Sequence, residues 1–229
     1  MTKKTILTVV TSVTILTASA FDALKDRPTP PRQIFPEISA AQRDARRAWW
    51  TQSRFGMFIH FGLYASPARH EWVQSMERIA PDVYAKRYLP QFNPDLFDAR
   101  DWARRAKQAG MKYMVLTAKH HEGFCMWDTK TTDYKITNTA FKRDLVREYV
   151  EAARAEGLRV GFYFSIKDWH HPDYLIDATH PLRPADGKFT DEIYEKLNAG
   201  RDWNRYRAYM YAQVKELLSD YGKIDIIWY

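Results

Sequence analysis

The chain has 229 residues, one cysteine and a formal net charge of +7 at neutral pH with histidines counted as neutral. Hydrophobic residues make up 45% and charged residues 28%, which excludes an intrinsically disordered protein. A single cysteine excludes disulfides within the chain and a cysteine-rich zinc site. Aromatic residues reach 15%, and because such rings are costly to expose, many must line a core or a ligand cleft.

The first twenty residues have the pattern of a secretory signal peptide. Lys3 and Lys4 are followed by an apolar stretch over 6–16 and by a small-residue cleavage signal, Ala-Ser-Ala, at 18–20. The alternative is an N-terminal strand, since the stretch is rich in Thr and Val. We expect 1–20 to be removed and the protein to be secreted or periplasmic. Residues 21–38 then form an extended, proline-rich leader, and 39–229 form the folded domain.

Neither a membrane nor a nucleic acid is an expected partner of the mature chain. No apolar run reaches the roughly 18 residues that a membrane-spanning helix needs. The basic residues are spread over expected helix surfaces, for example Arg104, Arg105 and Lys107, and a solvated helix face explains them better than a nucleic-acid-binding surface.

From residue 39 onward, helices and strands alternate along the chain. Apolar spacing and capping residues predict helices capped by Ser39, Asp98 and Asp144, and a last helix over 203–221. Apolar runs predict four strands, over 55–60, 111–117, 158–165 and 224–228.

This alternation predicts right-handed βαβ units and a parallel sheet. No glycine-rich nucleotide-binding turn follows a strand, which favours a (β/α)8 barrel over a Rossmann fold. A complete barrel needs eight strands and about 250 residues. We therefore predict an α/β fold, a TIM-like barrel of which about the first four β/α units are present.

In such barrels the carboxyl ends of the strands carry the active site. Here these ends carry imidazoles, carboxylates and rings: His60, Glu71, Trp72, His120, His121, Glu122, Tyr163, Asp168, Trp169 and Trp228. A single histidine after a strand is most often a structural residue, and neighbours on a strand point oppositely, so we expect neither a metal site nor another cofactor. As a group, rings that pack on a pyranose and groups that hydrogen-bond its hydroxyls suit a sugar.

Five segments in order carry a resemblance to a known family: 54–64 (RFGMFIHFGLY), 71–72 (EW), 97–102 (FDA and Trp102), 109–113 (AGMKY) and 119–127 (KHHEGFCMW). Over about 49–229 this series resembles the α-L-fucosidase family of glycoside hydrolases. The resemblance implies a retaining exo-α-L-fucosidase that removes terminal fucose from a fucosylated glycan. It assigns sugar contacts to His60, Glu71, Trp72, His120, His121, Tyr163 and Trp228. The match at Tyr163 is ambiguous by one position, because the neighbouring Phe164 is also aromatic.

The family's reaction needs a nucleophile and an acid/base, both carboxyl groups. The resemblance puts the nucleophilic Asp one position beyond Tyr229 and the acid/base further on. We therefore expect no catalytic residue within the chain and hypothesise an inactive fragment of a longer gene product. Glu122, Asp128 and Asp168 face the expected rim, but loop hydrogen bonding or rim charge explains them more simply.

Three alternatives stay open at this point. The chain could belong to a glycosidase for another sugar, of α-galactose-like configuration. It could be a carbohydrate-binding pseudoenzyme, or a metal-dependent hydrolase that uses the histidines. Helix packing explains the aromatics Phe97, Tyr206 and Tyr209, and Cys125 is interpreted as a packed thiol.

Overall fold

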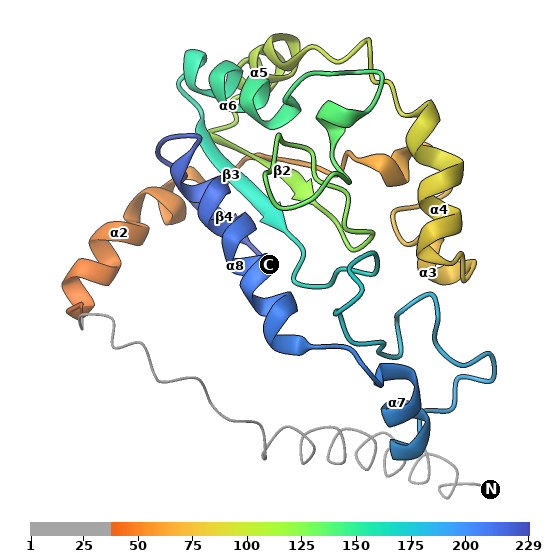
Figure 1. Cartoon of the computed structure of the whole chain (residues 1–229). Coiled ribbons are helices and arrows are strands. Elements are labelled where there is room, and N and C mark those ends of the chain that lie inside the picture. The colour runs from red at the N-terminus through yellow and green to blue at the C-terminus, as the bar shows by residue number, and fades with distance from the viewer. Residues whose placement is uncertain (1–37) are drawn as a thin grey trace, which may run out of the picture. The chain divides into compact units, whose positions relative to one another are not determined.

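A computed structural model describes residues 38–229 (Figure 1), so the predicted signal peptide and nearly all of the predicted leader lie outside the described residues. The chain divides into two units, 1–47 and 48–229. Helix α2 (Ala40–Ser53) begins in the first. The backbone amide of Ser39 donates to Oε1 of Gln42 at 2.8 Å, and the amide of Gln42 donates to Oγ of Ser39 at 3.2 Å. This reciprocal pair is a capping box and confirms the helix start predicted at Ser39.

Four parallel strands form one sheet in the order β1-β2-β3-β4. They are β1 (Met57–Ile59), β2 (Tyr113–Lys119), β3 (Arg159–Phe164) and β4 (Ile226–Trp228). The predicted parallel α/β architecture is therefore confirmed for the described part of the chain.

Helices connect each strand to the next. Between β1 and β2 lie α3 (Val73–Met76), α4 (Pro81–Tyr88) and α5 (Ala99–Gln108), with the short 3-10 helices η1 (Leu63–Ala65) and η2 (Leu89–Gln91). The 3-10 helix η3 (Ile136–Asn138) and α6 (Leu145–Ala155) precede β3, and α7 (Asp191–Asn198) and α8 (Trp203–Ser219) precede β4. None of the helices within 38–229 is long and apolar enough to cross a membrane.

Two predicted helix starts are confirmed by their caps. The Asp98 side chain accepts hydrogen bonds from the amides of Arg100 and Asp101, and the Asp144 side chain accepts one from the amide of Arg147. A carboxylate at this position satisfies amides that have no partner within the helix.

The strand bounds differ from the predicted ones. The second strand was expected over 111–117 but runs two residues later, because the amide of Met111 bonds the carbonyl of Ala106 and closes α5, while Lys119 still pairs with Phe164. β1 is shorter than 55–60 because it pairs with β2 only over Met57–Ile59. Helices α3, α4 and α7 were not predicted.

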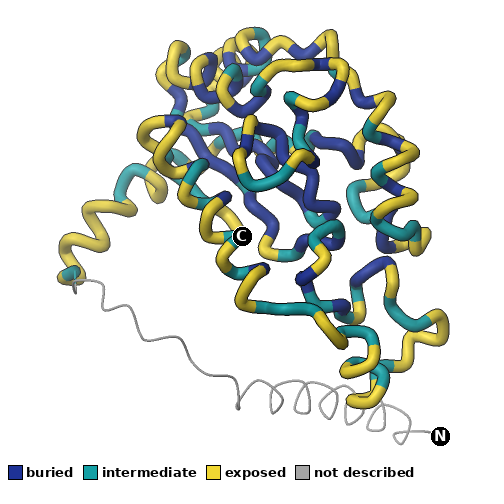
Figure 2. Tube along the Cα trace, viewed as in Figure 1, coloured by how far each residue is buried: buried dark blue, intermediate teal, exposed yellow. Residues whose placement is uncertain are grey.

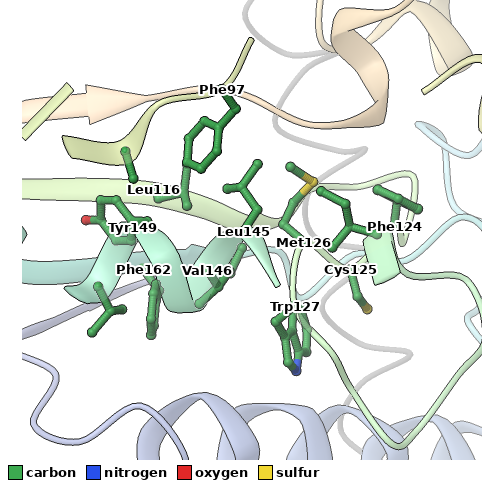
Figure 3. Packing of buried hydrophobic residues seen from close by; sticks show 14 of the residues in the cluster. Phe97, Leu116, Phe124, Cys125, Met126, Trp127, Leu145, Val146, Tyr149 and Phe162 are labelled. Atoms are coloured by element: carbon green, nitrogen blue, oxygen red, sulfur yellow. The ribbon is translucent and has the colours of Figure 1, made fainter. Parts of the chain in front are cut away.

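One face of the sheet is covered by α5 and α6, which pack side by side (Figure 1). Figure 2 shows the central strands as buried, and Figure 3 shows Leu145, Val146 and Tyr149 of α6 packed near Leu116 and Phe162 of the sheet. Burial of one such aliphatic or aromatic side chain contributes about 1.5–3 kcal/mol. The hydroxyl of Tyr149 also donates to a strand carbonyl on each of β2 and β3, which fixes α6 against the sheet.

The opposite face of the sheet is concave. Phe58 of β1 and Trp228 of β4 have ring centroids 5.4 Å apart. In a flat sheet the first and fourth strands lie about 14 Å apart, and side chains stand roughly perpendicular to it. The ring contact therefore indicates that the sheet curls. Within the curl, a Cβ on Gly161 would lie 2.9 Å from Cβ of Ile226, so the inner face of β3 and β4 has no room for a side chain there.

Candidate functional site

The predicted site residues that belong to the strands meet at one edge of the sheet. His60 follows β1, His120 follows β2, and Tyr163 and Trp228 lie at the ends of β3 and β4. The register pairs Tyr163 with Thr117 and with Trp228, so these three side chains share a face. The carboxyl ends of parallel strands lie together, and the site is built on that geometry.

The pairing of the strands decides which of Tyr163 and Phe164 faces the candidate site. Tyr163 is half-buried and faces the concave side, where its ring lies 6.0 Å from that of His60. Phe164 is buried on the other side, 4.3 Å beneath the ammonium of Lys119. Tyr163 is therefore the residue that faces the candidate site.

The three histidines lie close together. The ring centroids of His60 and His120 are 5.7 Å apart, those of His120 and His121 are 4.3 Å apart, and the Tyr163 ring lies 5.8 Å from that of His120. The expectation that His120 and His121 point oppositely is wrong, because β2 ends at Lys119 and both histidines lie in the turn that follows. The alternation of a strand does not apply to them.

Trp72 extends the cluster from the loop after β1. Its ring lies 4.8 Å from that of His121 and 5.5 Å from that of Trp169. Nδ1 of His121 lies 2.5 Å from Oγ of Ser165, and the amide of Trp169 donates to the carbonyl of His121 at 2.7 Å. The loop after β3 therefore fixes the orientation of His121.

Glu71 and Trp228 complete the predicted set. The half-exposed Glu71 carboxylate lies 3.9 Å from Nδ1 of His70, and its negative charge raises the pKa of both His120 and His121 against the larger effect of burial. Trp228 is 47% exposed and contacts the cluster through Phe58, which stacks on His60 at 5.1 Å. Six of the seven predicted residues thus belong to one network of ring contacts at this edge of the sheet, and Glu71 precedes Trp72 in the loop after β1.

His120 and His121 are neutral at physiological pH. Burial lowers the pKa of His120 to about 3, with a further contribution from His60. Burial also lowers the pKa of His121 to about 3. A neutral imidazole has one donor and one acceptor, which suits the hydroxyls of a sugar. Among the described residues, no group of three His, Cys, Asp or Glu side chains is placed to hold a metal ion.

Two of the three rim acids have the simple roles that we expected. Asp128 pairs with Lys135 at 2.8 Å in an exposed position. Asp168 accepts hydrogen bonds from two amides of its own loop and also forms a buried ion pair with Lys119 at 3.0 Å. Glu122 fits neither role: it is buried, and its Oε2 has no hydrogen-bond partner in the part of the chain that the structure describes.

Sequence reasoning missed several side chains that support the cluster. Thr117 bonds the backbone of Phe61 and the hydroxyl of Tyr64, and Ser165 holds His121. A hydroxyl residue within an otherwise apolar strand was the available signal for Thr117 and Ser165, because a buried hydroxyl needs a hydrogen-bond partner. Cys125 is a buried free thiol whose pKa is raised by burial, as its interpretation as a packed residue requires.

The comparisons with known proteins agree with one another. The family model "Alpha-L-fucosidase" matches residues 25–229. Tissue alpha-L-fucosidase from Homo sapiens is 32% identical over 192 residues, which cover 76% of this chain and 41% of the human protein. Alpha-L-fucosidase from Dictyostelium discoideum is 30% identical over 202 residues, covering 79% of this chain and 40% of that protein.

Solved structures show the same likeness. Alpha-L-fucosidase isoenzyme 1 from Paenibacillus thiaminolyticus is 54% identical with a TM-score of 0.75, over 81% of this chain and 42% of that one. The Lactobacillus casei enzyme, in complex with its α-L-fucose product, is 33% identical with a TM-score of 0.69, over 80% of this chain and 60% of that one. The chain spans about two fifths of the length of the curated relatives it matches. Because the family model covers nearly the whole chain, the protein belongs to the alpha-L-fucosidase family.

Proposed function

We propose that residues 48–229 form the fucose-binding part of a retaining exo-α-L-fucosidase that removes terminal fucose from oligosaccharides or glycoconjugates. The observation that carries the proposal is the ring cluster of His60, His120, His121, Tyr163 and Trp72 at the carboxyl edge of the sheet. The Lactobacillus casei relative, which has an α-L-fucose product bound, supports the choice of sugar.

The chemistry of fucose fits such a cluster. Its ring hydroxyls need both donors and acceptors, which neutral His120 and His121 and the Glu71 carboxylate supply. Its methyl group and apolar ring face need an aromatic surface, which Trp72 and the half-exposed Trp228 supply.

We propose further that the described strands are part of a (β/α)8 barrel. The curl of the sheet and the meeting of Phe58 with Trp228 support this, as do solved relatives of the same family. A retaining mechanism uses two carboxyl groups about 5–5.5 Å apart. We propose that the seven predicted residues bind fucose and that other carboxyl groups carry out the reaction.

The test is a calorimetric titration, in which α-L-fucose is added to the purified chain and the heat of binding is measured. Fucose should bind, and Trp72→Ala should weaken binding about tenfold or more, because the loss of one stacking ring costs about 1.4 kcal/mol or more. The matched control is Trp50→Ala, since Trp50 lies on α2 and contacts Tyr113 at the other end of the strands. It should leave the affinity unchanged.

Two outcomes would contradict parts of the proposal. A folded chain without affinity for fucose would refute the binding site. Tighter binding of α-galactose than of fucose would favour a glycosidase for another sugar.

We propose that residues 1–20 direct secretion or export to the periplasm. Lys3 and Lys4, the apolar stretch and the small residues at 18–20 support this. N-terminal sequencing of the protein exported by its host should begin at Phe21. An intact N-terminus on protein recovered from the cytoplasm would refute the proposal.

A further inference from the structure

A pair of buried polar atoms lies behind the candidate site without partners. Oε2 of Glu122 and Nδ1 of His120 are 3.6 Å apart, and neither has a hydrogen-bond partner among the described residues. Their side chains are each only 3% exposed. An unsatisfied buried polar atom costs about 1–3 kcal/mol. An approach of a few tenths of an ångström would join the two atoms and remove both penalties.

Among the residues that the structure describes, no cation near Glu122 is free to pair with it. Titratable groups from every neighbouring element face Glu122 or His120. The strands and the loop after β3 contribute Lys119 on β2, Tyr163 on β3 and Asp168 after β3. The other groups are Tyr64 on η1, Tyr84 on α4, Tyr134 before η3, and His60, Glu71 and His121 at the rim. Lys119 is the buried cation among them, and it already pairs with Asp168 at 3.0 Å. Apart from this ion pair, the buried neighbours are the phenols of Tyr64, Tyr84 and Tyr134, which are neutral at pH 7 because burial raises their pKa.

Burial therefore decides the protonation of the pair. Burial raises the pKa of Glu122 to about 8, with Asp168 adding to the rise and Lys119 and the backbone amide of Glu122 opposing it. Burial lowers the pKa of His120 to about 3. At neutral pH the pair thus consists of a carboxylic acid and a neutral imidazole, with one proton on each.

We propose that Glu122 is a positioning residue, which donates its carboxyl proton in a hydrogen bond to Nδ1 of His120 and thereby keeps the imidazole proton on Nε2. Nε2 is the nitrogen available to a ligand. It makes no hydrogen bond with a described residue, and, unlike Nδ1, it is not completely covered by the protein. With Glu122 protonated, His120 is a donor to a sugar oxygen.

Ionisation of Glu122 reverses this role. A carboxylate has no proton to give, so the imidazole proton moves to Nδ1 and donates to Oε2, and Nε2 becomes an acceptor. No proton is gained or lost by the ring in this change of tautomer; the proton from Glu122 goes to solvent. The inference rests on the proposed function only in taking His120 as a contact of fucose, because the tautomer exists without a ligand.

The test is nitrogen-15 NMR of the imidazoles in the full 229-residue chain from pH 6 to pH 10. Comparison with His120→Gln assigns the signals of His120. In the wild type the bare nitrogen should be Nδ1 at pH 6 and Nε2 at pH 10, with a midpoint near pH 8. Glu122→Gln cannot ionise, so His120 should keep one tautomer over the whole range. Glu151→Gln, an exposed matched control on α6, should behave as the wild type.

Fucose titrations over the same range separate this inference from the proposed function. Affinity should fall about tenfold between pH 6 and pH 10 in the wild type and stay flat in Glu122→Gln. A tautomer that stays fixed in the wild type, or that changes equally in Glu122→Gln, overturns the inference. A tautomer change without fucose binding at any pH refutes the proposed function and leaves the role of Glu122 standing. The wild-type titration decides the matter even where a variant unfolds.

Discussion

The ion pair of Lys119 and Asp168 is the interaction whose removal should destabilise the protein most clearly. Lys119 is fully buried and Asp168 is 1% exposed. The ammonium also donates to Oε1 of Gln213 on α8 at 2.9 Å, and Asp168 accepts from the amides of His170 and His171. Lys119 therefore joins β2, the loop after β3 and α8.

The substitution Lys119→Met keeps the length of the side chain and removes the charge. It leaves the Asp168 carboxylate buried with only amide donors, and breaking a buried pair in this way costs about 3–5 kcal/mol. For a domain of this size, each kcal/mol lowers Tm by about 2–4 °C, so Tm should fall by about 6–20 °C. Differential scanning calorimetry of the purified variant measures this shift.

Two further variants separate loss of the pair from general damage. Lys107→Met, at an exposed position on α5, should change the free energy of unfolding by no more than about 0.5 kcal/mol. Lys119→Met combined with Asp168→Asn should cost less than the sum of the two single substitutions, with a coupling energy above about 1 kcal/mol. A Tm within 2 °C of the wild type for Lys119→Met, or additive single effects, would refute the reasoning.

The same pair predicts the sign of a pH effect. Burial raises the pKa of Asp168, but the charge and hydrogen bond of Lys119 and the loop amides outweigh burial and hold it below its usual value. A carboxyl group whose pKa is depressed by folding stabilises the protein above its unfolded pKa, which is about 4, and this contribution is lost as the pH falls through the folded value. In Lys119→Met only the raising effect of burial remains, so Asp168 of the variant takes up its proton at a higher pH than in the wild type. The stability gap between wild type and variant should therefore narrow as the pH falls, beginning above about pH 4.

Substitutions at three other positions test the fold. Gly161→Val should cost about 1–3 kcal/mol in urea unfolding, because its Cβ would meet Ile226 at 2.9 Å; an unchanged midpoint would show that the inner face has free space. Asp98→Ala should cost about 1 kcal/mol through the lost cap of α5, and Asp98→Asn, which can still cap, should cost less. Tyr149→Phe should lower the free energy of unfolding by about 1 kcal/mol, since the Tyr149 hydroxyl bonds strand carbonyls at 2.7 and 3.1 Å. An unchanged free energy of unfolding would show that these hydrogen bonds do not contribute to stability.

Local sequence patterns were enough to predict the elements whose determining interactions lie within one turn or one strand. Caps such as Asp98 and Asp144 satisfy helix amides through their own neighbours, so the sequence contains the whole interaction. Strand ends are different, because pairing with a neighbouring strand sets them. Lys119 extends β2 by pairing with Phe164, which is distant in the sequence. Helix α7, with its Thr190 cap, lies in a stretch whose Pro, His and Gly residues obscured it.

The site was predictable as a set of residues but not as an electrostatic arrangement. His60, His120 and Tyr163 follow from the rule that strand ends meet, and the structure does bring them together. Pattern alone assigned Asp168 and Glu122 to the same class, acidic residues in loops at the rim. What separates them is a partner that comes from elsewhere in the chain. Lys119 pairs with Asp168, whereas Oε2 of Glu122 has no hydrogen-bond partner within residues 38–229.

That difference has a chemical consequence that extends to the ring cluster. A buried carboxyl group with a cation beside it stays ionised and contributes stability, as at Asp168. A buried carboxyl group without one keeps its proton and becomes a hydrogen-bond donor, as at Glu122. The adjacent His120 cannot take that proton, because its own burial disfavours the imidazolium. Two acids in the loops after the neighbouring strands β2 and β3 thus serve opposite purposes. Asp168 holds a loop, and Glu122 sets which nitrogen of His120 can donate.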